Sequence, residues 1–152
     1  MKEIQADKII SAVSELCINA NMFLPCDVKN SIETAKEQEP WPAAKEILGK
    51  ICENIQIAQK TQVPLCQDTG MACIFLELGQ DVHIVGMGLY DAINEGVRQG
   101  YAKGYLRKSV VGDPINRVNT KDNTPALINT EIVDGESLKI TVAPKGFGSE
   151  NM

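Results

Sequence analysis

The spacing of apolar residues changes near residue 70, and this change favours an α+β fold. Before it, apolar side chains recur every three or four residues in the stretches 9–20 and 44–58, which predicts two amphipathic helices. A polar stretch, 27–39, predicts a shorter helix between them, ended by Pro40 and Pro42. We therefore expect a helical N-terminal region.

The residues after this change predict two β-hairpins. Residues 72–78 form a run that is apolar except for Glu77, and residues 81–85 alternate in the manner of a strand after a turn. Residues 126–133 and 138–143 also alternate, and a helix over residues 89–101 separates the two pairs. We expect the two hairpins to form a mainly antiparallel four-stranded sheet packed with helices.

Composition limits the class of protein. The chain has 152 residues, of which 43% are hydrophobic and 23% are charged, which is typical of a single globular domain. A net charge of −5 argues against a nucleic-acid partner, because binding phosphates requires clustered lysine and arginine. No stretch approaches the roughly 20 apolar residues of a membrane span, and the five cysteines fit no disulfide framework. We expect a cytoplasmic protein without a membrane partner.

The densest group of reactive side chains is the segment from Cys66 to Gly70. It combines a thiol, an amide, a carboxylate and a hydroxyl on one short turn. Cys66 could bind a metal, and Asp68 could act as a general acid or base or could simply cap the turn. The tripeptide Asp-Thr-Gly also occurs in aspartic proteases of the retroviral type. The helical first 60 residues argue against an all-β protease half.

A second polar segment, residues 109–123, is too long to be a simple connection. The side chains of Asn119, Thr120, Asn123 and Thr124 predict a loop held by local bonds from side chains to the backbone. Long loops of this kind often line a binding site. Near the end of the sequence, glycines before Ser149 predict the start of a helix.

Four segments in a fixed order resemble the iron-sulfur hydro-lyases. The resemblance is to the N-terminal part of the α subunit of class I fumarate hydratases and L(+)-tartrate dehydratases, and it runs from about residue 60 to the end. It implies that residues 1–152 are a truncated N-terminal portion of the domain that binds the cluster and the substrate. The matching residues are Pro64 to Gly70; Tyr105, Leu106, Arg107, Lys108 and Ser109; Asp113, Pro114, Arg117, Asn119, Thr120, Asp122, Asn123, Thr124, Pro125 and Ala126; and Lys145, Gly146, Gly148, Ser149, Glu150 and Asn151.

The resemblance implies a [4Fe-4S] cluster in the complete enzyme. Family members hold it by three cysteines, and Cys66 matches the first of these. The other two lie beyond Met152 in the family, so we expect this chain alone to hold no cluster and to be inactive.

The resemblance also assigns residues to the substrate. Asp68 is implied in catalysis, by proton transfer or by orienting a hydroxyl, and Gln67 as a hydrogen-bond donor to the substrate. Arg107 matches an arginine that binds a substrate carboxylate, a task that suits its planar guanidinium. Thr69 and Gly148 are also expected in the substrate site, although Phe147 stands where many members have glycine.

The implied reaction is the reversible hydration of fumarate to malate, a step of the tricarboxylic acid cycle. Dehydration of L(+)-tartrate is the alternative within the family, and a non-catalytic module that docks a β subunit is the alternative from another class. The expected partners are a four-carbon dicarboxylate and a β subunit or swivelling domain, and we expect a homo-oligomer.

Overall fold

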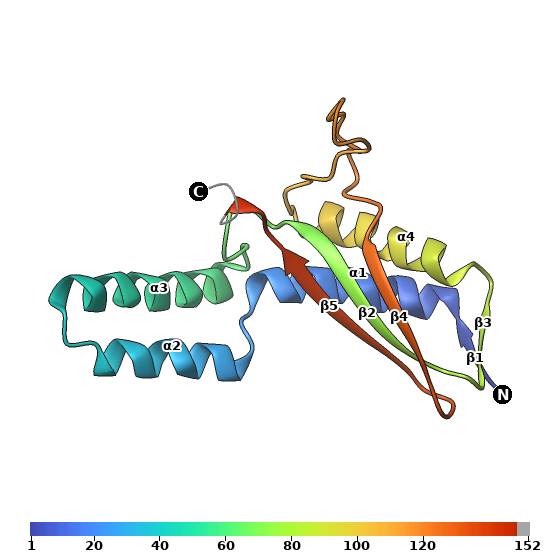
Figure 1. The fold of residues 1–152 in the computed structure, drawn as a ribbon, viewed down its shortest axis with the longest axis horizontal. Coiled ribbons are helices and arrows are strands. Elements are labelled where there is room, and N and C mark those ends of the chain that lie inside the picture. The colour runs from blue at the N-terminus through green and yellow to red at the C-terminus, as the bar shows by residue number, and fades with distance from the viewer. Residues whose placement is uncertain (149–152) are drawn as a thin grey trace. The chain divides into compact units, whose positions relative to one another are not determined.

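A computed structural model describes residues 1–148 of the chain (Figure 1). The chain forms two units, which are described separately. Unit 1 comprises Met1–Ala20 and Gln67–Met152, and unit 2 comprises Asn21–Cys66. The helix expected after Ser149 lies outside the described residues.

Unit 2 is a pair of helices that pack against each other. Helix α2 (Cys26–Gln38) and helix α3 (Pro42–Thr61) confirm the two helices predicted for this region. Proline is favoured at the start of α3, since the first helical N–H groups have no partner within the helix. The helix ends at Gln62, whose left-handed backbone directs its N–H to the carbonyl of Ala58.

Unit 1 contains two small sheets. The larger has the order β4-β2-β5, in which β2 (Met71–Gly79) pairs parallel with β4 (Leu127–Val133) and antiparallel with β5 (Leu138–Lys145). The smaller is a parallel pair of β1 (Lys2–Gln5) and β3 (Val82–Val85). The α+β class is confirmed.

The predicted four-stranded antiparallel sheet of two hairpins is wrong. Strand β3 leaves β2 and pairs with β1, which the sequence pattern had not indicated as a strand. Strands β4 and β5 flank β2 on opposite sides and do not pair with each other. The connection between them, residues 134–137, spans two strand spacings of about 4.8 Å each, so four residues suffice to pass over the end of β2.

Gly79 shows why the hairpin signal was misleading. The Gly-Gln pair does turn the chain, but Gly79 also donates its N–H to the Ser137 carbonyl at 2.7 Å. A Cβ on Gly79 would lie 2.4 Å from the carbonyl oxygen of Gly135 and 2.8 Å from that of Ser137. Glycine is therefore required here by the close approach of the β4–β5 connection.

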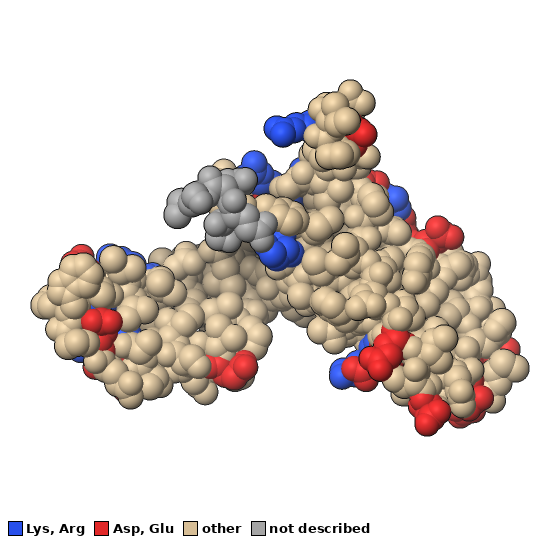
Figure 2. All heavy atoms as spheres, in the orientation of Figure 1, with Lys and Arg blue, Asp and Glu red and all other residues tan. Residues whose placement is uncertain are grey.

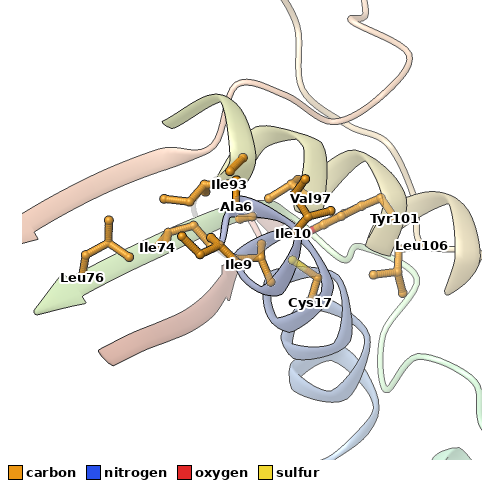
Figure 3. Packing of buried hydrophobic residues seen from close by; sticks show 13 residues of the cluster. Ala6, Ile9, Ile10, Cys17, Ile74, Leu76, Ile93, Val97, Tyr101 and Leu106 are labelled. Carbon is orange, nitrogen blue, oxygen red and sulfur yellow. The ribbon is translucent and has the colours of Figure 1, made fainter. Parts of the chain in front are cut away.

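Helices α1 (Ala6–Met22) and α4 (Leu89–Lys103) share the core of unit 1 with β2 (Figure 3). Alternate residues of β2 face this core, because side chains alternate across a strand. The core joins α1, β2 and α4 through these side chains: Ala6, Ile9, Ile10, Val13, Cys17, Ala72, Ile74, Leu76, Ala92, Ile93, Val97, Tyr101 and Leu106.

One stretch within the described residues, Ala6–Gln38, is long and apolar enough to pass a composition test for a membrane span. It includes α1, which buries Ile9, Val13 and Cys17 in the core of unit 1. Burial raises the pKa of the Cys17 thiol to about 12. The apolar face of α1 thus packs in the core of unit 1.

Candidate substrate-binding site

A cavity of about 410 Å³ in unit 1 brings together side chains that are far apart in the sequence. Asp68, Arg107, Ser109, Phe147 and Gly148 line it. They come from the turn before β2, the segment after α4 and the segment after β5. Such a volume suits a small organic molecule, and two of the lining side chains can carry opposite charges.

A second cavity of about 240 Å³ shares Ser109 and Phe147 with the first. Its other lining residues are Met71, Val110 and Val111. A charged cavity and an apolar one therefore have a common wall.

The Asp68 carboxylate joins two of these segments. Its Oδ1 accepts a hydrogen bond from the N–H of Gly70 at 3.0 Å, and its Oδ2 accepts one from the N–H of Phe147 at 3.1 Å. Asp68 thus caps its own turn, as one reading of the sequence allowed, and also fixes the segment that follows β5. Each oxygen keeps acceptor capacity for a further donor.

Gly70 allows the same two segments to meet. It has a φ of +61°, and a Cβ at this position would lie 2.1 Å from the carbonyl oxygen of Lys145. Since backbone cannot move aside cheaply, only glycine fits between the Asp68 turn and the end of β5.

Arg107 is exposed, and its backbone is held in place by hydrogen bonds from buried side chains. Thr69 is buried and donates its hydroxyl to the Arg107 carbonyl at 2.9 Å. The Tyr101 hydroxyl in turn donates to the carbonyl of Thr69 at 2.9 Å and lies 3.2 Å from that of Gly70. Within residues 1–148 the guanidinium of Arg107 has no ion pair, so its charge is available to a ligand in the cavity.

Asn123 connects the long loop to the site. Its side chain is fully buried, its Oδ1 accepts the N–H groups of Ser109 at 2.8 Å and Val110 at 3.1 Å, and its Nδ2 donates to the Gly70 carbonyl at 3.1 Å. Its φ of 64° is one that asparagine tolerates better than most residues. One amide thus fixes three backbone groups from two segments.

The loop is held by side chains in part as the sequence predicted. Asn119 donates to the Lys108 carbonyl at 2.8 Å and accepts from the Lys121 N–H at 2.6 Å, and Thr120 donates its hydroxyl to the Val110 carbonyl at 3.2 Å. The structural role predicted for these side chains is confirmed, but the prediction of local bonds is wrong for the bonds to Lys108 and Val110. Thr124 instead donates its hydroxyl to the Asp122 carboxylate at 2.8 Å.

The six predicted site residues occupy different positions. Asp68, Arg107 and Gly148 line the charged cavity, whereas Thr69 is buried and contacts Arg107 through its backbone. The other two, Gln67 and Cys66, are exposed and do not line this cavity, and Cys66 is the last residue of unit 2. Sequence reasoning had not assigned Tyr101 or Ser109 to the site, since neither has a local pattern that distinguishes it from a core or loop residue.

The described residues do not fit an iron-sulfur cluster on their own. Residues 1–148 contain no group of three histidine, cysteine, aspartate or glutamate side chains that could hold a metal ion. Cysteine thiolates are the usual cluster ligands, and Cys66 offers one exposed thiol. A cluster would need ligands from outside these residues.

Figure 2 shows the charged side chains on one face of the protein. On that face the lysine and arginine side chains form separate groups with neutral atoms between them, and acidic groups are frequent. A continuous basic surface, which nucleic-acid binding requires, is not visible in this view.

Comparison with known proteins identifies the family. Residues 10–152 match the model of the Fumarate hydratase (Fumerase) family. The chain is 40% identical, over 95% of its length, to a putative L(+)-tartrate dehydratase subunit alpha of Methanocaldococcus jannaschii, and it covers 53% of that protein. It is 34% identical, over 86% of its length, to the anaerobic class I fumarate hydratase of Escherichia coli K12, of which it covers 24%.

A second tartrate dehydratase subunit alpha, from Escherichia coli UTI89, is 27% identical over 97% of the chain, which covers 49% of it. The chain thus spans about half the length of the tartrate dehydratase subunits and about a quarter of the fumarate hydratases. The family model matches nearly the whole length of the chain. The chain therefore belongs to the fumarate hydratase family, as the four segments indicated.

Proposed function

We propose that this chain is part of the α subunit of a hydro-lyase that reversibly adds water to the double bond of a four-carbon dicarboxylate. The observation that carries the proposal is the cavity in which Asp68 and Arg107 meet. A cation that has no ion pair within residues 1–148, in the same cavity as a carboxylate, is suited to bind an anionic substrate and to handle a proton or a hydroxyl. The reaction type follows the names of the relatives, which are fumarate hydratases and tartrate dehydratases.

Arg107 binds one substrate carboxylate in this proposal. Its guanidinium lines the cavity and has no ion pair within the described residues, and its planar fork can donate two parallel hydrogen bonds to a carboxylate. Thr69 fixes the Arg107 backbone, so we propose that Thr69 serves the substrate site through Arg107. Gly148, on the cavity wall, presents no side chain to the ligand.

Asp68 orients the substrate hydroxyl or transfers a proton. Its two backbone bonds fix the carboxylate while each oxygen keeps the capacity to accept one more donor. Gln67 precedes it and is exposed, and we propose that its amide donates to the substrate. The negative charge of Asp68 would also repel the second substrate carboxylate, the one that Arg107 does not bind. This repulsion would favour one orientation of the substrate in the cavity.

Cys66 is proposed as one thiolate ligand of a [4Fe-4S] cluster completed by residues outside 1–148. Two peptide units separate Cys66 from Asp68, so chain connectivity alone keeps their Cα atoms within about 7 Å. Because the described residues lack a full ligand set, we assign no chemical step to the cluster.

Substrate choice within the family is left to experiment between fumarate and L(+)-tartrate. The identity of 40% to a relative named as a tartrate dehydratase subunit supports tartrate, and that of 34% to a fumarate hydratase supports fumarate and a place in the tricarboxylic acid cycle. Names that include "subunit alpha" support a β subunit as partner, and we propose a cytoplasmic homo-oligomer of the assembled enzyme.

The test uses the natural α chain assembled with its β subunit and reconstituted with iron and sulfide without oxygen. We expect turnover of fumarate and malate, or of L(+)-tartrate. Arg107→Ala should lower kcat/KM by about a hundredfold, since truncating one side of a hydrogen-bonded charge pair costs several kcal/mol. Steady-state assays with each substrate give the answer.

Cysteine variants test the cluster assignment in the same preparation. Cys66→Ser should abolish both cluster absorbance and activity, whereas Cys26→Ser, a matched change of another exposed cysteine, should leave both intact. Retention of the cluster by Cys66→Ser would contradict the ligand assignment. A fully loaded complex that turns over none of the three substrates would favour the non-catalytic docking module.

A further inference from the structure

Ser109 carries a buried hydroxyl that has no hydrogen-bond partner among residues 1–148. Its Oγ is inaccessible to solvent and makes no hydrogen bond within the described residues 1–148. A buried polar group without a partner destabilises the folded state, so such groups in native proteins call for an explanation. Ser109 also lines both the charged and the apolar cavity, so its buried hydroxyl lies within one side chain's length of the candidate site.

The backbone around Ser109 is fixed, so only its side chain is free to adjust. Its N–H donates to Asn123 Oδ1 at 2.8 Å, and the next N–H, of Val110, donates to the same oxygen at 3.1 Å. A serine side chain has three staggered rotamers, so rotation about the Cα–Cβ bond can move the hydroxyl without moving the backbone. Of the two cavities that Ser109 lines, the charged one, which Arg107 also lines, is the one suited to a polar ligand.

We propose that Ser109 is a substrate-binding residue whose hydroxyl donates a hydrogen bond to the same substrate carboxylate that Arg107 binds. This inference rests on the proposed function. A carboxylate has about four acceptor positions, of which a bidentate arginine uses two, so a hydroxyl donor can be added without competition. Asp68, on the same cavity wall, cannot share that carboxylate without repulsion, which places the carboxylate on the side of Ser109 and Arg107.

The decisive variant is Ser109→Ala, which removes only the hydroxyl. It is tested in the natural α chain assembled with its β subunit, and the probe is succinate, a four-carbon dicarboxylate that has no double bond to hydrate. Calorimetry should show the Kd for succinate raised about tenfold, the usual cost of a lost hydrogen bond to a charged group. The KM for the turned-over substrate should rise more than kcat falls.

Two comparison variants make the result specific. Ser109→Thr keeps the hydroxyl and adds a methyl group beside the apolar cavity of Met71, Val110 and Val111, so it should restore most of the succinate affinity. Ser11→Ala removes an exposed serine hydroxyl from α1 and should change nothing in binding. Thermal unfolding without ligand should show Ser109→Ala to be as stable as the wild type or more so, because its hydroxyl has no partner to lose.

A double-mutant cycle with Arg107→Gln tests whether the two residues act on one carboxylate. The loss of succinate affinity in the double variant should be smaller than the sum of the two single losses. A purely structural role of Ser109 would give additive losses.

Several results would overturn the inference. They are unchanged succinate affinity in Ser109→Ala, equal losses in the alanine and threonine variants, additive losses in the cycle, failure of Ser109→Ala to fold, or no binding of succinate by the wild type. Failure of the proposed reaction is recognised separately. In that case the wild type would turn over none of fumarate, malate or tartrate, while succinate binding would still depend on Ser109.

Discussion

The two units of the protein differ in how their parts are held together. Unit 1 joins helices and strands distant in sequence through a buried core and through side chains such as Asn123 that each bind several backbone groups. Unit 2 is a local helix pair, and no residue of its helix α2, all of which is described, is buried. Several of its apolar side chains remain exposed, including Trp41 at 65% and Ile47 at 61%. The side chains of unit 1 are therefore the ones that are fixed firmly enough to position a bound ligand.

The largest effect is expected at Asn123. Asn123→Ala leaves the N–H groups of Ser109 and Val110 and the Gly70 carbonyl without their partner and puts alanine at positive φ. We expect the free energy of unfolding to fall by about 4 kcal/mol, from about 1 kcal/mol for each unpaired group and about 1 for the backbone. Denaturant titration gives the value.

Asn123→Asp separates the contributions at this position. Aspartate keeps the acceptor and tolerates positive φ, but it loses the donor to Gly70 and buries a negative charge beside that carbonyl oxygen, so at neutral pH it should cost at least as much as alanine. A cost below about 1 kcal/mol for the alanine variant would show that water replaces the amide and that unit 1 is less tightly connected than described.

The next effect compares one isoleucine from each unit. Ile74→Ala in β2, fully buried, should cost about 3 kcal/mol because it leaves a cavity in the core. Ile47→Ala in α3, which is 61% exposed, should cost less than about 1 kcal/mol. Equal losses, measured by denaturant titration, would mean that the exposed face of unit 2 is covered in the assembled protein.

The smallest effect concerns acid stability in unit 1. Although desolvation would raise the pKa of Asp122, hydrogen bonds from Thr124 and from Arg98 lower it to about 2, from an ordinary value of 3.8. A lowered folded-state pKa adds stability above pH 3.8 that is lost as the pH falls toward 2. Since the pair with Arg98 is partly exposed, this contribution is about 1 kcal/mol or less.

Asp122→Asn should therefore flatten the loss of the thermal midpoint between pH 4 and pH 2, relative to the wild type. Asp134→Asn, at an exposed turn residue, is the matched control. It should leave the loss of the thermal midpoint between pH 4 and pH 2 unchanged. If the thermal midpoint of Asp122→Asn fell with pH as steeply as that of the wild type, the salt bridge to Arg98 would not be a source of acid sensitivity.

The helices could be predicted from sequence because their signal is local. The period of apolar residues and the positions of Pro40 and Pro42 predicted α1, α2, α3 and α4 within a few residues. The positions of β2, β3, β4 and β5 were also close, since alternation is local too, whereas β1 was not predicted. Pairing is not local, and for this reason the central position of β2 and the pairing of β3 with β1 were missed.

The site shows the same division. The four segments and the family resemblance singled out Asp68, Arg107 and Gly148, which do line one cavity. Nothing in the sequence indicated that Asn123 and Tyr101 would reach the Asp68 turn, because those bonds join residues 53 and 31 or 32 positions apart. Such contacts depend on the fold as a whole.

The central position of β2 has a consequence for how the protein is made. During synthesis β2 leaves the ribosome well before its neighbours β4 and β5, which begin at Leu127 and Leu138. Its apolar residues 71–76 remain unpaired until both neighbouring strands have been synthesised. Non-local strand pairing is intrinsically slow and exposed to aggregation. The cavity walls meet later still, when Phe147 reaches Asp68, so the cavity can form only after all three strands of the larger sheet have been synthesised.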